Sequence, residues 1–249
     1  MTTGESKNKP DYGVDGFHLE WGIPFVVLVE AAVFAGGGYL TVLPGLLPKT
    51  AGALLFLIGL AMGMIMGSWF FYVKGGKLHY RDRLLSLINW RGDERVLDVG
   101  TGRGLLMIGA AKKLSTGKSI GIDIWRREDL MDNTPKNTLR NVELEGVLDK
   151  VEIQNQDARK MSFPDGYFDV ILSNLCLHNI PGRAEREKAC QEIVRVLKPG
   201  GTAILSDDLF HAKEYAGVFK REGLRVESLQ DHFRKGFPLH GIVKAFKKP

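Results

Sequence analysis

Apolar residues are distributed differently in the first third of the chain and in the remainder. Residues 51–73 form an uncharged run of 23 residues, and residues 23–43 form a second apolar run in which Glu30 is the one charged side chain. A helix as long as the first of these runs rises about 34 Å, enough to cross a hydrocarbon core of ~30 Å. The connection at 44–50 contains two prolines and a glycine, which favour a chain reversal. These runs predict a two-helix transmembrane hairpin over 23–73.

Beyond residue 94, short apolar runs alternate with amphipathic stretches of helical period. Strands that alternate with helices predict an α/β domain, with a mainly parallel, seven-stranded sheet and helices on both faces. The strand ends then meet at one edge, where ligands bind in such sheets. The expected strands are 95–100, 119–125, 151–158, 167–175, 202–208, 225–233 and 241–248, and the expected helices are 105–114, 135–146, 186–198 and 211–222. The expected parts of the chain are an N-terminal segment (1–22), the hairpin (23–43 and 51–73), a juxtamembrane linker with a first helix (74–94) and the α/β domain (95–249).

Basic residues concentrate after the apolar runs. Of the 34 lysines and arginines only three precede residue 74, and the connection between the runs holds only Lys49. The second run is followed by four basic residues, Lys74, Lys77, Arg81 and Arg83. Because positive charge near the ends of spans remains in the cytoplasm, we expect both termini and the α/β domain to be cytoplasmic. The 22 mostly polar residues before the first run argue against a cleaved signal peptide.

The composition excludes several classes of site. The two cysteines, Cys176 and Cys190, and the six histidines match no metal-ligand spacing, so no metal site is expected. No tyrosine is followed by lysine at the fourth place, which argues against a short-chain dehydrogenase. The basic residues are dispersed and no nucleic-acid-binding motif is present, so no nucleic acid partner is expected.

The most informative segment joins the expected strand 95–100 to the helix that follows it. It reads Asp98-Val-Gly100-Thr101-Gly102-Arg-Gly104. Glycines there allow a tight turn and let backbone N–H groups approach a ligand closely. The dinucleotide fingerprint would need glycine or alanine at position 105 or 107, where leucine and methionine stand, so a nicotinamide cofactor is disfavoured.

The order D-x-G-x-G-x-G resembles the first motif of class I S-adenosylmethionine-dependent methyltransferases, which have a Rossmann-like fold. The resemblance extends over residues 95–208, includes the LKPGG turn at 197–201, and implies S-adenosylmethionine as the cofactor. It implies that the carboxylate of Asp123 accepts hydrogen bonds from the ribose hydroxyls, and that the adenine packs on Ile124 and Trp125 near the Asp157-Ala158 pair. The residues expected to bind the cofactor are Asp98, Gly100, Thr101, Gly102, Gly104, Asp123, Ile124, Trp125, Asp157, Ala158, Ser173 and Asn174.

Within that superfamily, residues 163–181 resemble the ubiquinone/menaquinone C-methyltransferase-like branch through the pattern L-x-L-H-x-I at 175–180. Ser-Asn-Leu-Cys stands at 173–176 in place of Asn-Pro-Pro-Tyr, which argues against methylation of the amino groups of adenine or glutamine. His178 is the candidate general base for an acceptor that must lose a proton. The alternative is a structural role in which the ring only packs or hydrogen-bonds.

Together these features predict a membrane-anchored methyltransferase that transfers a methyl group from S-adenosylmethionine to a small or lipophilic acceptor. The alternative is a membrane scaffold that binds S-adenosylmethionine without catalysis. Methyl transfer from labelled cofactor separates the two, because only the enzyme produces it.

The N-terminal segment carries a further expectation. Residues 10–17 contain Tyr12 and two carboxylates, unlike the polar residues 1–9 before them. We expect residues 10–17 to dock on the catalytic domain as a lid, with Tyr12 near the cofactor cleft, where the lid would exclude water. The alternative is a disordered tail, which is the usual state of a terminus.

The hairpin contains two features that suggest how its helices pack. Small residues recur at every fourth position, at Gly59, Gly63 and Gly67, which lets a second helix approach closely. The expected partners are Ala31, Ala35 or the glycines at 36–38, and dimerisation through the same residues is the alternative. Glu30 lies inside an apolar run and is expected to be protonated or paired, with Ser68 as a candidate partner.

Overall fold

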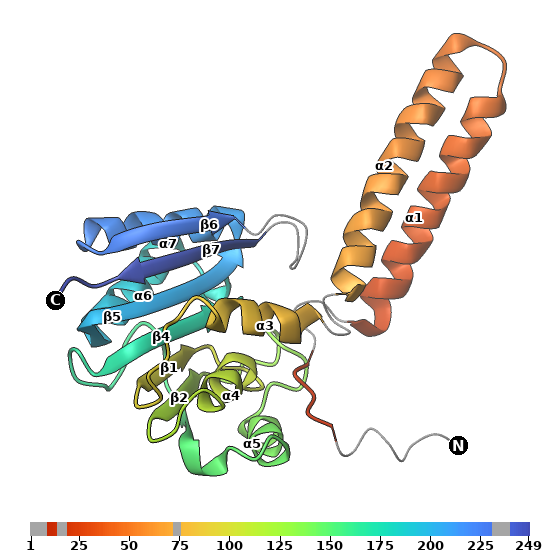
Figure 1. The fold of residues 1–249 in the computed structure, drawn as a ribbon. Coiled ribbons are helices and arrows are strands. Elements are labelled where there is room, and N and C mark those ends of the chain that lie inside the picture. The colour runs from red at the N-terminus through yellow and green to blue at the C-terminus, as the bar shows by residue number, and fades with distance from the viewer. Residues whose placement is uncertain (1–8, 14–18, 72–75, 231–239) are drawn as a thin grey trace, which may run out of the picture. The chain divides into compact units, whose positions relative to one another are not determined.

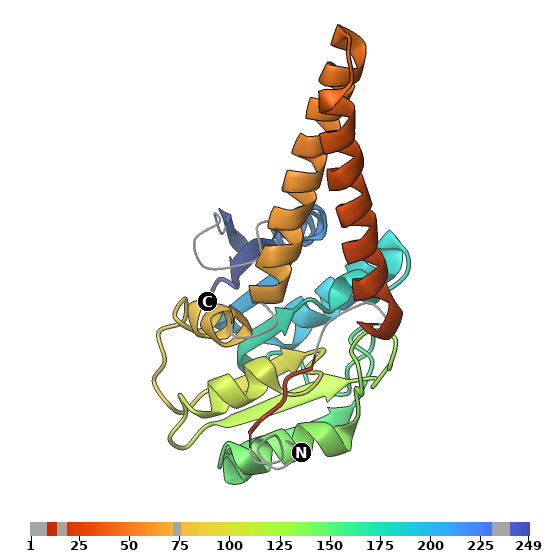
Figure 2. The same ribbon diagram turned by 90° about the vertical axis from the view of Figure 1, so that its right-hand side faces the viewer.

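The chain divides into two compact units. The computed structural model describes residues 9–13, 19–71, 76–230 and 240–249 (Figures 1 and 2). One unit is helical and comprises Gly16–Gly76, and the other comprises Met1–Asp15 together with Lys77–Pro249. The N-terminal residues therefore belong to the same unit as the α/β domain, although the helical unit separates them from it in sequence.

The helical unit is a pair of helices, α1 (Leu19–Val42) and α2 (Leu46–Phe71), joined through residues 43–45. Two helices were expected here, but the expected start of the second helix at 51 is wrong. Pro48 lies in the first turn of α2, where proline is tolerated because first-turn N–H groups have no acceptor within the helix. The expected residues 72–73 lie outside the described part of the chain.

Glycines allow close contact between the backbones of α1 and α2. A Cβ atom on Gly37 would lie 2.9 Å from the backbone nitrogen of Phe56, and one on Gly52 would lie 2.7 Å from the carbonyl oxygen of Gly37. Neither glycine could be replaced without moving a backbone. Gly37 therefore packs against Gly52 and Phe56, and not against the expected stripe at Gly59, Gly63 and Gly67.

Two of the three small residues of the expected stripe on α2 face α1, but against different side chains. A Cβ atom on Gly59 would lie 2.7 Å from the ring of Phe34, and one on Gly63 would lie 2.5 Å from Oε1 of Glu30, whereas one on Gly67 would meet nothing within 4 Å. The nearest atoms of α1 to Gly59 and Gly63 are therefore those of Phe34 and Glu30 and not those of the expected alanines. The side chain of Ser68, the expected partner of Glu30, lies outside the described residues.

One described helix is long and apolar enough to cross a membrane. The qualifying stretch is Leu46–Met64 in α2, judged by length and composition. The apolar part of α1, Val27–Val42, is shorter. Large apolar side chains on both helices are exposed within the unit, including Leu28, Leu54 and Leu57.

The α/β unit is built on one sheet with strand order β3-β2-β1-β4-β5-β7-β6. Strands β1 to β5 run parallel to one another, and β7 is antiparallel to both β5 and β6. The expected mainly parallel, seven-stranded sheet is confirmed. The order reverses between β1 and β4, and such a reversal opens a crevice beyond the C-terminal strand ends. The strands are β1 (Arg95–Val99), β2 (Lys118–Asp123), β3 (Val151–Asn155), β4 (Phe168–Asn174), β5 (Leu197–Asp208), β6 (Arg225–Gln230) and β7 (His240–Phe246).

Helices cover both faces of this sheet (Figure 1). One face carries α4 and α5, whose Met107, Ile108 and Val142 form a buried cluster. The other carries α6 and α7, which contribute to the main core against the inward side chains of β1, β4 and β5. The helices of this unit are α3 (Lys77–Leu85), α4 (Leu105–Ala111), α5 (Pro135–Leu144), α6 (Arg183–Val196) and α7 (Leu209–Arg221).

The LKPGG segment is not the expected turn before the fifth strand. It belongs to β5, which begins at Leu197, and the register of β5 on β4 shifts there between Phe168 and Val170. Gly200 donates its backbone N–H to the carbonyl oxygen of Lys247. This bond to the segment after β7 keeps the glycines in the sheet as a bulge instead of a free turn.

Candidate active site

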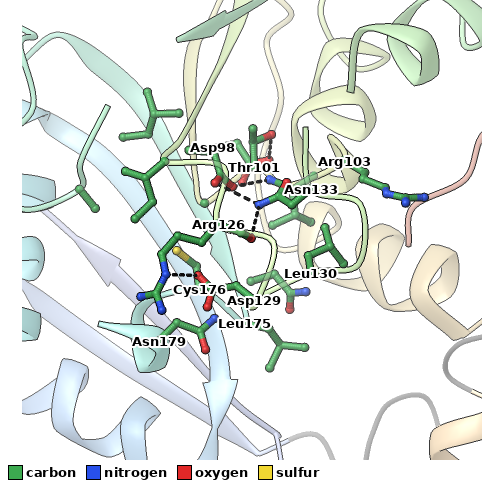
Figure 3. Close-up of a pocket in the computed structure, with 18 of the residues that line it drawn as sticks. Asp98, Thr101, Arg103, Arg126, Asp129, Leu130, Asn133, Leu175, Cys176 and Asn179 are labelled. Atoms are coloured by element: carbon green, nitrogen blue, oxygen red, sulfur yellow. Dashed lines mark hydrogen bonds and ion pairs between the residues drawn. The ribbon is translucent and has the colours of Figure 1, made fainter. Parts of the chain in front are cut away.

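A pocket with about 1,090 Å³ of empty space, part of which is open solvent, lies beyond the C-terminal ends of β1, β2 and β4 (Figure 3). Its wall comes from the β1–α4 loop, the β2–α5 loop, the segment after β4, and the N-terminal segment. Nine of the residues expected to bind a cofactor line it: Asp98, Gly100, Thr101, Gly102, Asp123, Ile124, Asp157, Ala158 and Asn174.

The glycine loop after β1 is held in place by the neighbouring strand. The backbone N–H groups of Gly100 and Thr101 both donate to the carbonyl oxygen of Ile122, at 2.9 and 3.0 Å. Gly100 has a φ of 71°, and a Cβ atom there would overlap the sulfur of Cys176. This position therefore needs glycine for both its backbone conformation and its space.

Asp98 is buried at the base of the loop. Its Oδ2 accepts hydrogen bonds from Oγ1 of Thr101 at 2.8 Å and from the backbone N–H of Met107 at 2.9 Å. Burial raises the pKa of Asp98 to about 7, although the hydrogen bonds from Thr101 and Met107 act in the opposite direction. Asp98 thus ties the loop to the first turn of α4.

Asp123 ends β2, and both of its carboxylate oxygens contact the loops beside it. Oδ2 accepts from the backbone N–H of Gly102 at 2.8 Å, and Oδ1 accepts from that of Trp125 at 2.6 Å. Oδ1 also accepts from Nδ2 of Asn133 at 3.3 Å, so Oδ2 is the oxygen that keeps a lone pair for a hydroxyl group of a ligand.

Asp157, after β3, is held by an arginine that sequence reasoning missed. Nε and Nη2 of Arg159 both donate to Asp157, at 2.6–3.0 Å, and these bonds lower the pKa of the carboxyl group. Arg159 also contacts Glu185 at the start of α6. A ligand amino group at Asp157 would therefore share the carboxylate with Arg159.

Three expected cofactor residues do not line the pocket. Gly104 lies at the N-cap of α4, and Ser173 is buried and donates its hydroxyl to the carbonyl oxygen of Val99. Successive side chains of a strand point to opposite faces, so Asn174 reaches the pocket and Ser173 does not. Trp125 has a φ of 57°, a left-handed conformation that turns the chain, and Arg126 and Asp129 occupy the wall instead (Figure 3).

His178, the expected general base, also lies outside the pocket wall, next to the lining residues Asn179 and Ile180. Its Nδ1 lies 2.7 Å from Oδ1 of Asp207, which is buried at the end of β5. The hydroxyl of Tyr215 donates to the other carboxylate oxygen of Asp207 at 3.0 Å. Burial lowers the pKa of His178, but the contact with Asp207 and nearby carboxylates outweigh it, and the net shift is upward.

The N-terminal segment docks beside the pocket. Tyr12 lines the pocket, and Asp11 forms an ion pair with Arg103 of the glycine loop at 2.5 Å. The expected docking is confirmed for residues 10–13, while 14–17 lie outside the described residues. Sequence reasoning missed the side chains that receive this segment, because they belong to distant elements.

Two buried oxygens in the pocket wall have no hydrogen-bond donor among the described residues. They are Oδ1 of Asn133 and Oδ1 of Asn174. Buried polar atoms are nearly always paired, so orphaned acceptors in a pocket indicate a ligand that brings donors. Other wall residues that sequence reasoning did not single out include Lys77, Arg103, Asp129, Leu130, Leu175 and Cys176.

Residues 97–205 match the family model described as a methyltransferase domain. The match covers less than half of the chain. Apart from Tyr12 and Lys77, every residue that lines the pocket lies inside the matched range of the methyltransferase domain.

Curated relatives are similar to part of the chain. An uncharacterized protein of Haemophilus influenzae is 30% identical over 146 residues, 59% of this chain and 55% of that one. The ubiquinone/menaquinone biosynthesis C-methyltransferase UbiE of Vibrio campbellii is 34% identical over 116 residues, 46% of this chain and 41% of that one. The chain spans about half the length of the curated relatives it matches.

Solved structures share the fold of the α/β unit. A SAM-dependent methyltransferase from Aquifex aeolicus aligns with a TM-score of 0.56 at 20% identity, over 69% of this chain and 91% of that one. The [4+2]-cyclase SpnF aligns with a TM-score of 0.55 at 17% identity, over 69% of this chain and 80% of that one. Because these neighbours carry different activities, the likeness concerns fold alone.

Proposed function

We propose that the protein transfers a methyl group from S-adenosylmethionine to a small acceptor of lipophilic character. The observation that carries this proposal is the pair of buried acceptors, Oδ1 of Asn133 and of Asn174, in the wall of a pocket beside a glycine loop. S-adenosylmethionine brings ammonium, amino and hydroxyl donors of the kind these oxygens lack. The residues present therefore fit this cofactor.

The cofactor is proposed to lie across the ends of β1 and β2. Asp123 accepts its ribose hydroxyls, and Ile124, half exposed at 47%, offers an apolar surface to its adenine. Ala158 and Asp157 lie at the far side of the adenine. The backbone of Gly100 to Gly102 approaches the methionine part, with Asp98 fixing the loop from below.

When bound, S-adenosylmethionine supplies an electrophilic methyl group, so the residues of this chain mainly position the acceptor and exclude water. His178 is the proposed general base for an acceptor that carries an acidic proton. Asp207 contacts its Nδ1, which leaves Nε2 as the ring nitrogen that takes the proton. The contact is 2.7 Å without aligned hydrogen-bond geometry, and such bonds tighten when substrate binds.

The acceptor is proposed to come from a membrane. In this proposal α1 and α2 insert as a two-pass hairpin, with both termini and the catalytic unit in the cytoplasm. The apolar stretch Leu46–Met64 and the exposed leucines of both helices support insertion. Leu130, Leu175 and Ile180 add apolar surface to the pocket wall, which suits a lipophilic acceptor.

Two measurements on the full-length protein in detergent test the proposal. Calorimetry should detect S-adenosylmethionine binding, and Asp123→Ala should weaken it by about 1.5–3 kcal/mol, the range for hydrogen bonds to charged groups. Unchanged affinity in that variant would contradict the assigned cofactor site.

The second measurement follows labelled methyl groups into an extract of cells that lack the protein. The enzyme should label a component of the organic phase. A scaffold that binds S-adenosylmethionine without catalysis, the competing function, would bind the cofactor equally well and label nothing.

A further inference from the structure

One buried side chain receives the backbone of the N-terminal segment. Asn141, on α5, accepts the backbone N–H of Asp11 at 2.9 Å, and its Nδ2 donates to the carbonyl oxygen of Asp11 at 2.8 Å. The same Nδ2 donates to the carbonyl oxygen of Arg103 in the glycine loop at 2.9 Å. Asn141 and Arg103 are both buried. Asn141 therefore connects the segment directly to the loop that forms the pocket.

Arg103 holds the segment by charge. Its guanidinium is only 6% exposed, and Nη1 lies 2.5 Å from Oδ2 of Asp11 while Nη2 donates to the carbonyl oxygen of Met131 at 2.9 Å. In Figure 3 the Arg103 side chain points away from Cys176 toward the trace of the N-terminal segment. A buried charge is costly unless it is paired, so Asp11 stabilises this arrangement.

Tyr12 and Gly13 fit the same surface. The hydroxyl of Tyr12 donates to Oε1 of Glu145 at 2.7 Å, and its ring packs against the apolar cluster of α4 and α5. Gly13 has a φ of 67°, and a Cβ atom there would lie 2.9 Å from Leu130 and 3.1 Å from Arg103. The catalytic unit thus contacts the backbone of Asp11, the ring of Tyr12 and the closely approaching Gly13 in turn. A loosely attached tail would not require these contacts.

We propose that residues 11–13 form one wall of the cofactor pocket, so that docking of this segment and binding of S-adenosylmethionine strengthen each other. This inference rests on the proposed function. Tyr12, Arg103 and Leu130 all line the pocket, so a ligand that fills it contacts both the segment and the residues that receive it. Two binding events that share contacts are coupled, and the coupling is reciprocal.

The docked segment also contacts the residue at which the second stretch of the catalytic unit begins. The carbonyl oxygen of Gly13 accepts a hydrogen bond from Nζ of Lys77 at 2.8 Å, and Lys77 is the residue at which the chain re-enters the catalytic unit. Lys77 is buried and lines the pocket. Cofactor binding therefore reinforces a contact between the two separate stretches of chain that make up the catalytic unit.

The decisive experiment compares two carboxylates that contact the same arginine. Asp11 and Asp132 are 76% and 73% exposed and lie 2.5 and 3.5 Å from Arg103, but only Asp11 belongs to the segment. Asp11→Asn keeps a side-chain oxygen that can accept the Gly13 N–H, and it removes both the charge and the oxygen that accepts from Nη1 of Arg103. By calorimetry on the full-length protein, it should weaken S-adenosylmethionine binding about fivefold or more, the lower range of coupling between sites. Asp132→Asn should leave the affinity within about twofold.

Hydrogen exchange gives the reciprocal readout, which does not depend on activity. S-adenosylmethionine should slow exchange of the Asp11 and Gly13 amides in the wild type, and should slow it less in Asp11→Asn. A deletion of residues 1–13 serves as the second variant, with thermal unfolding to verify that it folds. If the deletion variant folds and binds the cofactor like the wild type, the inference is overturned. It is also overturned if the cofactor does not change the exchange rates of the Asp11 and Gly13 amides. If the wild type itself binds no S-adenosylmethionine, the proposed function fails instead.

Discussion

Nδ1 of His178 lies 2.7 Å from Oδ1 of Asp207, a carboxylate that is 2% exposed and also accepts the hydroxyl of Tyr215. This arrangement predicts a pH dependence. Because the net shift in the pKa of His178 is upward, its ring should titrate above its ordinary value of about 6.5. A base must be neutral to act, so methyl transfer to a protonated acceptor should rise with pH through that higher pKa. The ring nitrogens can be followed by NMR in the full-length protein, with His178→Gln to assign the signal.

Asp207→Asn should lower the pKa of His178, because burial still disfavours the imidazolium and the compensating charge is gone. The other groups that face His178 are Asp129, Asp208, His211 and Tyr215. His211, whose ring centre is 6.0 Å away and which has its own carboxylate in Asp208, supplies the matched control. His211→Gln should leave the acid limb of the activity profile in place. An unchanged His178 titration in Asp207→Asn would exclude Asp207 as the positioning residue.

Asp98 should reduce the stability of the unliganded protein at neutral and higher pH. Burial raises its pKa to about 7, so the folded state favours the neutral carboxyl group. That contribution to stability is fully present below the unfolded pKa and is lost as the pH rises through about 7. Asp98→Asn keeps an oxygen for Thr101 and Met107 and cannot ionise. From pH 5.5 to pH 8, the unfolding free energy of Asp98→Asn should therefore increase relative to that of the wild type by about 1 kcal/mol or more. Thermal unfolding at both pH values measures this, and exposed Asp93→Asn should show no such trend.

Gly100 is constrained twice, by its φ of 71° and by the sulfur of Cys176. Gly100→Ala should lower the unfolding free energy by about 2–4 kcal/mol, the sum of left-handed strain and overpacking. Gly223 has a φ of 83° with open space around it, so Gly223→Ala should cost only the strain. A double-mutant cycle with Cys176→Ala should recover part of the difference at Gly100. Equal destabilisation at the two glycines would show that the sulfur contact is unimportant.

The sequence predicted best the site residues at the C-terminal ends of buried strands. Asp98 and Asp123 could be assigned because strand ends fix the position of the side chains beyond them. Trp125 was misplaced because a left-handed backbone conformation, which no local pattern indicated, turns it away from the pocket. Ser173 was misplaced because the inward and outward alternation at the end of β4 depends on register.

Residues that act through partners distant in the chain could not be found from local patterns. Arg159 binds Glu185 from 26 residues away, and Asn141 receives Asp11 from 130 residues away. Such pairs are chosen by packing between elements, and arginine or asparagine occurs on many solvated helix faces. The fold was predictable because strand and helix periods are local, whereas the start of α2 was not, since proline is compatible with both a turn and a first helical turn.

The last prediction concerns the pair of helices and the proposed insertion. Oε1 of Glu30 fills the space beside Gly63, where a Cβ atom would lie only 2.5 Å away, whereas a Cβ atom on Gly67 meets nothing within 4 Å. Gly63→Ala should therefore only displace the carboxyl group of Glu30, which ends a flexible side chain, and Gly67→Ala should change nothing. Gly52→Ala, which would meet the backbone of Gly37 at 2.7 Å, should separate the helices and lower thermal stability. Glu30→Gln preserves the shape of the side chain and removes any charge from an apolar span, so insertion and methyl transfer should persist. A reporter fused after Pro249 should be active in the cytoplasm for the wild type and for Glu30→Gln. Loss of activity in Glu30→Gln with normal insertion would assign the carboxyl group a function that packing against Gly63 does not explain.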